Sequence, residues 1–130
     1  MILATSMFHV LGLVALARLL KRTAQLTFFT SHTRRAIGLL AISILIIVGI
    51  HTIEAWSWAA VYISVGEFDQ LATALYFSVV TSTTLGYGDI TLSESWQLLA
   101  TFEAMGGLIL FGASTAFMLA VMRNLFGDMK

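Results

Sequence analysis

Three long runs of apolar residues follow one another along the chain, separated by shorter polar stretches. A bilayer core about 30 Å thick needs roughly 20 mostly apolar residues for one spanning helix. The runs over residues 1–20, 36–65 and 96–122 therefore predict three membrane-spanning helices. The first run is the shortest, and the alternative for it is a helix lying in the membrane interface, although it lacks the lysine-rich polar face of such helices.

A fourth apolar stretch, residues 72–90, lies between the second and third runs but cannot form a simple span. Its residues 86–89, Gly-Tyr-Gly-Asp, interrupt the helical pattern, and non-helical backbone at membrane depth must be buried by protein or line a watery cavity. We therefore predict a re-entrant loop, in which a short helix over about residues 70–82 enters the membrane and an extended segment returns. Gly66 is expected to end the preceding helix, and Asp69 to cap the short one.

The composition agrees with a membrane protein and excludes several functions. Hydrophobic residues make up 58% of the 130 residues and charged residues 11%, with a mean hydropathy of +0.91, which is too apolar for a soluble domain of this size. Seven basic and seven acidic residues cancel, so nothing favours binding to nucleic acid. No nucleophile with a suitable base and no cofactor-binding loop is recognisable, so we predict no enzymatic activity and no organic cofactor.

Metal binding by protein side chains is not predicted either. The chain has no cysteines, which excludes disulfides and thiolate metal sites. His9, His32 and His51 lie too far apart in sequence for a local metal-binding spacing.

The distribution of charge predicts the orientation of the chain in the membrane. Five of the seven basic residues fall within residues 18–35, which contain no acidic residue. Because Lys and Arg in short loops favour the cytoplasmic side, residues 21–35 are predicted to form a basic cytoplasmic loop. The amino terminus and the region between the second and third spans then face outside, and the carboxyl terminus faces inside.

Residues 81–89, Thr-Ser-Thr-Thr-Leu-Gly-Tyr-Gly-Asp, resemble the signature of potassium channels, whose core is Thr, an aliphatic residue, Gly, Tyr, Gly and usually Asp. The order of helix, pore loop and helix matches as well, so the resemblance covers roughly residues 36–122. It implies an all-α membrane protein with the tetrameric potassium channel pore fold and one extra N-terminal helix. The implied elements are the N-terminal transmembrane helix (1–20) and a pore domain (36–130) with an outer helix (about 36–65), a pore helix (about 70–82), a filter (84–88) and an inner helix (about 96–122).

The resemblance assigns ion binding to the filter backbone. Carbonyl groups of Thr84, Leu85, Gly86 and Tyr87 from four identical chains would bind potassium ions in place of water, with the Thr84 hydroxyl completing the innermost site. Successive carbonyls face one axis only if the backbone alternates between ordinary and mirror-image dihedral angles, which Gly86 and Gly88 allow at little steric cost.

Other residues around the filter are predicted to support it. Asp89 lies at the outer mouth, where a ring of four carboxylates would concentrate cations, or where it ties the loop to a neighbouring group. In relatives paired aromatic residues of the pore helix brace the filter tyrosine; the matching positions are Tyr76 and Phe77, and the Tyr76 hydroxyl could meet Tyr87. Leu85 stands where valine or isoleucine is usual, and because its carbonyl is the working part, we expect selectivity to survive.

A carboxylate in the last span is the remaining candidate for filter support. Some relatives hold a carboxylate on the pore helix behind the filter, but the matching position here is Val80. Glu103 lies at a depth where a charge is costly unless paired or hydrated. We expect Glu103 to approach the back of the pore helix and to hydrogen-bond near Thr81 or Tyr87, the alternative being that the outer end of its helix is wet.

The resemblance favours a potassium-selective channel, while the sequence does not identify its gating stimulus. Gly106 and Gly107 correspond to a region where inner helices of the family often hinge, although helix packing explains glycines equally well. The alternatives for function are a non-selective cation channel and a non-conducting regulatory membrane subunit. Expected partners are three further copies of the chain, membrane lipid and an unidentified regulatory protein, in a multi-pass protein of the bacterial inner membrane.

Overall fold

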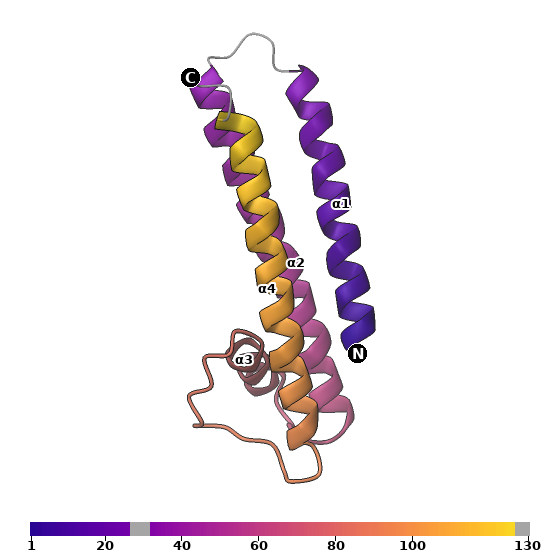
Figure 1. Ribbon diagram of the computed structural model, residues 1–130. Coiled ribbons are helices and arrows are strands. Elements are labelled where there is room, and N and C mark those ends of the chain that lie inside the picture. Colours follow the sequence, from indigo (N-terminus) through magenta and orange to yellow (C-terminus); the bar gives the residue numbers. More distant parts are fainter. Residues whose placement is uncertain (27–31, 127–130) are drawn as a thin grey trace.

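The computed structural model describes residues 1–26 and 32–126, and the described residues form four α-helices and no strand. Helices α1, α2 and α4 are long and run alongside one another, whereas α3 is short and packs near one end of α2 and α4 (Figure 1). This part of the chain is therefore all-helical, as predicted. The helices are α1 (Ile2–Leu26), α2 (His32–Ser64), α3 (Leu71–Ser82) and α4 (Gln97–Phe126).

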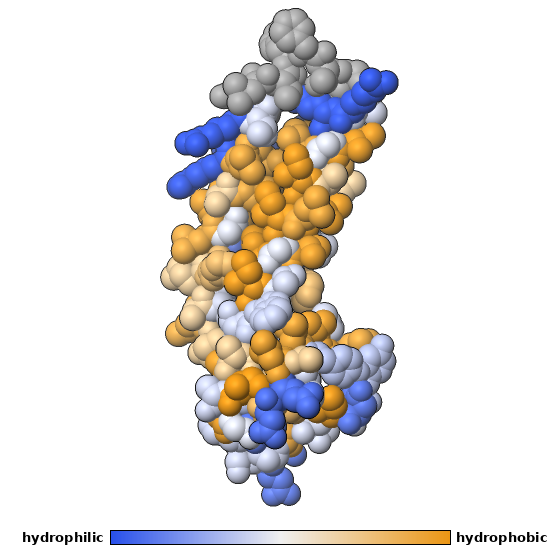
Figure 2. Space-filling model, turned by 180° about the vertical axis from the view of Figure 1, so that it is seen from behind, coloured by the Kyte–Doolittle hydropathy of each residue, from blue (hydrophilic) through white to orange (hydrophobic). Residues whose placement is uncertain are grey.

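Three of these helices are long and apolar enough to cross a membrane: α1 over Ile2–Thr23, α2 over Thr33–Ser64 and α4 over Gln97–Phe126. Figure 2 shows a broad hydrophobic band between two hydrophilic ends of the molecule. Large apolar side chains of the long helices are exposed, including Leu3 at 87% and Leu45 at 71%. Exposed apolar surface of this extent suits contact with lipid, and the protein is an integral membrane protein.

The basic segment differs from its prediction because the helices on both sides of it are longer than expected. Helix α1 continues through Arg22 to Leu26, and α2 begins at His32. Lys and Arg are good helix formers, and neither glycine nor proline interrupts the sequence here, so a spanning helix continues beyond the apolar run. Most of the predicted loop over residues 21–35 is thus helical, while residues 27–31 lie outside the described part.

A glycine ends α2, as the sequence predicts. Gly66 has a φ of +80°. Its N–H donates to the carbonyl of Ile63 (3.1 Å), and the N–H of Glu67 donates to the carbonyl of Tyr62 (3.0 Å). These two bonds form a Schellman motif, in which a left-handed residue, usually glycine, closes the helix. The chain thereby turns sharply from α2 toward α3.

Helix α3 begins without the predicted cap. Gln70 occupies the N-cap position and makes no capping bond through its side chain, so the expectation that Asp69 caps the helix is wrong. The position of α3 is fixed by packing instead. Phe77 packs edge-on against Tyr62, with ring centroids 5.1 Å apart. The buried core around this pair comprises Trp58, Ala59, Tyr62, Ala74, Phe77 and Leu92.

Candidate functional site

The segment after α3 has an alternating backbone. Thr84, Gly86 and Gly88 have φ angles of +58°, +55° and +73°, and Thr84 is the one non-glycine residue with a positive φ in the described part of the chain. Every second residue of the segment therefore lies in the left-handed region, which a strip of carbonyls facing one axis requires. The two glycines were predicted to have this role, whereas the part of Thr84 was not predicted.

Thr84 acquires its positive φ by ending α3. Its N–H donates to the carbonyl of Thr81 (2.9 Å), and the N–H of Leu85 donates to the carbonyl of Val80 (3.0 Å), which is a second Schellman motif. Glycine usually fills this position, because a β-branched residue there is strained by about 1–3 kcal/mol. Thr84 is therefore a strained residue at the start of the segment.

A hydrogen bond ties the pore helix to the outer end of the segment. The Tyr76 hydroxyl donates to Oδ2 of Asp89 (2.7 Å), and the N–H of Ile90 donates to Oδ1 (3.1 Å). The bond to Asp89 raises the pKa of the Tyr76 phenol, so the phenol keeps its proton at neutral pH. The predicted bond from Tyr76 to Tyr87 is thus replaced by one to Asp89, because the extended segment reaches the level of Tyr76 at residue 89.

The segment between α3 and α4 is held at its other end by Glu67, which lies in the turn between α2 and α3. Its carboxylate accepts hydrogen bonds from the N–H (2.8 Å) and the hydroxyl (2.5 Å) of Ser93. Leu92, the neighbour of Ser93, is buried in the core around Tyr62. The segment between α3 and α4 is therefore anchored at both ends within one chain.

Two side chains in the middle of the segment between α3 and α4 are largely exposed. Leu85 is 55% exposed and Tyr87 67% exposed in the single chain. Phe77, which was expected to brace Tyr87, is instead 6% exposed and lies in the core beside Tyr62. A single chain therefore leaves one side of this segment open.

Behind α3, Glu103 joins the three helices of the pore region. It lies on α4 and is 1% exposed. The Tyr62 hydroxyl on α2 bonds its Oε2 (2.5 Å), and the Ser78 hydroxyl on α3 lies 2.5 Å from its Oε1. Glu103 thus approaches the back of the pore helix, but its partners are not Thr81 or Tyr87. Ser78 belongs to the buried face of α3, whereas Thr81 is only half-buried.

The number of protons available for hydrogen bonds around Glu103 favours a protonated carboxyl. The Ser78 hydroxyl lies within bonding distance of the Ala55 carbonyl (3.0 Å) as well as of Glu103. A serine has one proton to donate, so an ionised Glu103 and the carbonyl would compete for it. A protonated Glu103 donates to Ser78, which then donates to Ala55, and every group is satisfied. A neutral carboxyl is also the cheaper form at membrane depth.

One of the two predicted hinge glycines lies against the end of the pore helix. A Cβ added at Gly107 would collide with the backbone carbonyl of Ser82, the last residue of α3. A Cβ at Gly106 would make only ordinary contact with Ile2 of α1, at 3.9 Å. Helix α4 is continuous through both positions. The structure thus gives Gly107 a packing role, and hinging at Gly106 and Gly107 stays a prediction.

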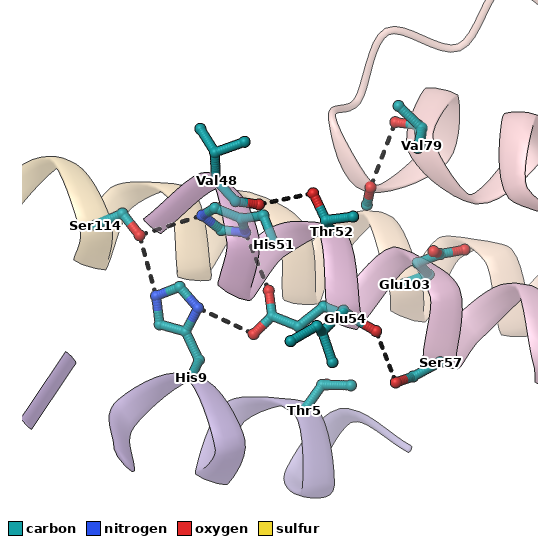
Figure 3. Close-up of polar contacts among 12 residues, drawn as sticks. Thr5, His9, Val48, His51, Thr52, Glu54, Ser57, Val79, Glu103 and Ser114 are labelled. Carbon is teal, nitrogen blue, oxygen red and sulfur yellow. Dashed lines mark hydrogen bonds and ion pairs between the residues drawn. The ribbon is translucent and has the colours of Figure 1, made fainter. Parts of the chain in front are cut away.

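A second buried polar cluster, which was not predicted from the sequence, lies between α1, α2 and α4. His9, His51, Glu54 and Ser114 come from these three helices and point toward one another (Figure 3). His9 is fully buried and Glu54 is 7% exposed. The available signal was a polar residue in the middle of each apolar helix, but their local spacing did not show that they converge.

Together, the fold and the site define a membrane protein in which two long helices, α2 and α4, flank a short helix and an extended segment. A family model described as an ion channel matches residues 48–124, more than half of the chain. The chain therefore belongs to this ion channel family.

A curated relative agrees with this assignment. The chain is 33% identical over 104 residues to the voltage-gated potassium channel Kch of Escherichia coli (strain K12). The match covers 76% of this chain and 22% of that protein, so the chain spans about a fifth of its length. Both findings support membership of the pore-domain family of potassium channels. No solved structure matches the chain.

Proposed function

We propose that the protein conducts potassium ions selectively and passively through a filter built by four copies of the chain. The observation that carries this proposal is the alternating backbone at Thr84, Gly86 and Gly88 within the signature sequence. Rings of backbone carbonyls can replace the hydration shell of a potassium ion. The carbonyls of Thr84, Leu85, Gly86 and Tyr87 are the proposed ligands, potassium is the bound ion, and conduction requires no organic cofactor.

The proposed assembly is a homotetramer. One chain contributes one strip of carbonyls, and a complete ring of ligands requires copies related by rotation about the conduction axis. The exposed side chains of Leu85 and Tyr87 supply surface for a neighbouring copy to cover. Four copies follow from the resemblance to potassium channels, whose filters have fourfold symmetry.

The outer mouth adds an electrostatic element to the proposal. Four copies of Asp89 would surround the entrance and raise the local concentration of cations. Its hydrogen bond from Tyr76 does not neutralise the carboxylate, because the phenol is the donor. Asp89 can therefore both hold the loop and attract ions. With membrane lipid around the assembly, we place it in the bacterial inner membrane, where an unidentified regulatory protein could control it.

Ion flux through the purified protein tests this function. In liposomes with potassium and sodium on opposite sides, we expect a reversal potential close to that of potassium. The Gly86→Ala variant should abolish the current, because alanine is strained at a φ of +55°. Gly112→Ala is the matched control, since a Cβ there meets nothing within 4 Å and no positive φ is involved.

Two other results would contradict the proposal. A reversal potential near zero would identify a non-selective cation channel. A folded protein that conducts under no condition would identify a regulatory subunit. Neither result would change the membership of the chain in the ion channel family.

A further inference from the structure

A closed ring of polar contacts joins four side chains inside the membrane-spanning part of the molecule (Figure 3). The Nδ1 atoms of His9 and His51 lie 3.0 Å from Oε1 and Oε2 of Glu54, respectively. Their Nε2 atoms lie 3.1 Å and 3.2 Å from the hydroxyl oxygen of Ser114. Each histidine thus bridges the same carboxylate and the same hydroxyl.

The ring needs one proton more than two neutral histidines, one serine and an ionised carboxylate provide. Four hydrogen bonds require four protons, whereas two neutral histidines and one serine supply three and an ionised Glu54 none. The fourth proton lies on a histidine or on Glu54, and in either case the ring carries no net charge. A neutral ring can be buried at membrane depth without an uncompensated charge.

We propose that this cluster is a binding site for a divalent transition metal ion such as zinc. One ring nitrogen of His9, one of His51 and a carboxylate oxygen of Glu54 all lie within 4.8 Å of one another. In a tetrahedral site with bonds of about 2.0–2.1 Å, neighbouring ligand atoms are roughly 3.3 Å apart. Each Nδ1 atom lies 3.0 Å from its own oxygen of the Glu54 carboxylate, that of His9 from Oε1 and that of His51 from Oε2, so each of these two contacts is about 0.3 Å short of that separation.

Ser114 is placed to orient both ligands. When Nδ1 of each histidine binds the metal, the remaining hydrogen of each ring lies on Nε2. Both Nε2–H groups then donate to the Ser114 oxygen, which has two lone pairs and already lies at bonding distance from each. The additional proton of the metal-free ring is released as the metal binds.

The space beside the cluster suits a fourth ligand. Two histidines and a glutamate form a ligand set that proteins use for zinc with one open position. A cavity of about 30 Å³ touches His51 and Glu54 and extends to Glu103 and Gly106. This volume accommodates one water molecule, which can complete the tetrahedron.

A metal ion here would link the extra N-terminal helix to the pore. His9 lies on α1, whereas His51 and Glu54 lie on α2. The ion would therefore fix α1 against α2 and stabilise the folded state. This proposal concerns metal binding and does not depend on whether the filter conducts.

Metal titration of the purified full-length protein tests the site. Cobalt(II) is the optical probe, because tetrahedral coordination gives it strong visible absorption bands, and zinc is the competing ion. We expect about one cobalt ion per chain, displaced by zinc, and a rise in the melting temperature on addition of zinc. No absorption band and no shift in melting temperature with the wild-type protein would overturn the proposal, whatever the variants do.

Single substitutions assign the binding to the cluster. His9→Ala and His51→Ala should each weaken cobalt binding at least tenfold. His32→Ala is the matched control, because it removes the remaining histidine, at the first residue of α2 and about five helical turns before His51. Binding that survives both cluster substitutions, or that is lost with His32→Ala, would place the metal elsewhere and refute the site.

Discussion

Glu103 connects α2, α3 and α4 through two hydroxyl groups, those of Tyr62 and Ser78. A polar group buried without a partner costs about 1–3 kcal/mol, while each bond that satisfies it contributes about 0.5–1.5 kcal/mol. The position of the pore helix relative to its two neighbours therefore depends strongly on this one side chain. Whether the Glu103 carboxyl is protonated decides which substitutions are tolerated at position 103.

Glu103→Gln should keep both stability and conduction. A glutamine is neutral and nearly isosteric, so its NH₂ can donate to Ser78 while its carbonyl accepts from Tyr62, as the protonated carboxyl does. Glu103→Ala should lower the free energy of unfolding by about 1–3 kcal/mol, because the buried Tyr62 hydroxyl loses its hydrogen-bond partner, while the Ser78 hydroxyl keeps the Ala55 carbonyl. Thermal unfolding in detergent and potassium flux in liposomes measure both effects. If glutamine were as damaging as alanine, Glu103 would have to be ionised.

At the scale of the helices, contact between α4 and the end of α3 requires Gly107. The backbone carbonyl of Ser82 occupies the space that a Cβ at this position would need. Because Ser82 ends α3 and Thr84 begins the alternating segment, we expect any shift of Ser82 to be transmitted to the proposed filter. Close approach of two helix backbones in a membrane commonly depends on such small residues.

Gly107→Ala should therefore reduce the potassium current and the stability of the assembly. The obstructing atoms belong to the backbone and cannot move aside as a flexible side chain can. Gly106→Ala is the adjacent control and should be tolerated, since its Cβ would meet Ile2 at 3.9 Å. Current density and melting temperature of the two variants provide the comparison. If Gly106→Ala proved the more harmful variant, bending of α4 would explain the glycines better than packing.

The helices were the predictable part of the structure, because long apolar runs and a glycine stop signal act locally. Gly66 ended α2 where its sequence context indicated. The helices continue into the basic segment. Hydropathy could not show this, because the length of an apolar run reports the thickness of the membrane and not the residue at which a helix ends.

The partners of buried polar groups were less predictable, because they depend on how helices are rotated against one another. Glu103 was expected near the pore helix, but local sequence does not specify that Ser78 and Tyr62 face it. His9 and His51 are 42 residues apart in sequence and belong to different helices. Their contacts with the same carboxylate, that of Glu54, therefore depend on how the helices pack. The residues of the proposed filter could be located from the sequence because the signature is contiguous.

For the whole molecule, one chain forms a wall of the proposed pore but does not enclose one. Its three long helices run alongside one another, and α3 with the filter segment projects from one side of them (Figure 1). The side chains of Leu85 and Tyr87, which belong to the proposed filter, remain largely exposed. Conduction should accordingly depend on the composition of the assembly and not on single chains.

Mixing wild-type chains with a non-conducting variant measures how many chains build one pore. Gly86→Ala places a strained residue in the filter while leaving the helix contacts intact, because a Cβ there meets nothing within 4 Å. If a tetramer needs four intact strips, equal amounts of the two chains leave about one-sixteenth, roughly 6%, of pores fully wild-type. The potassium current should then fall as the fourth power of the wild-type fraction. A linear decline would show that each chain conducts alone, and a quadratic decline would indicate that two chains suffice. The Gly112→Ala chain, mixed in the same proportions, should leave the current unchanged and so separates filter damage from dilution.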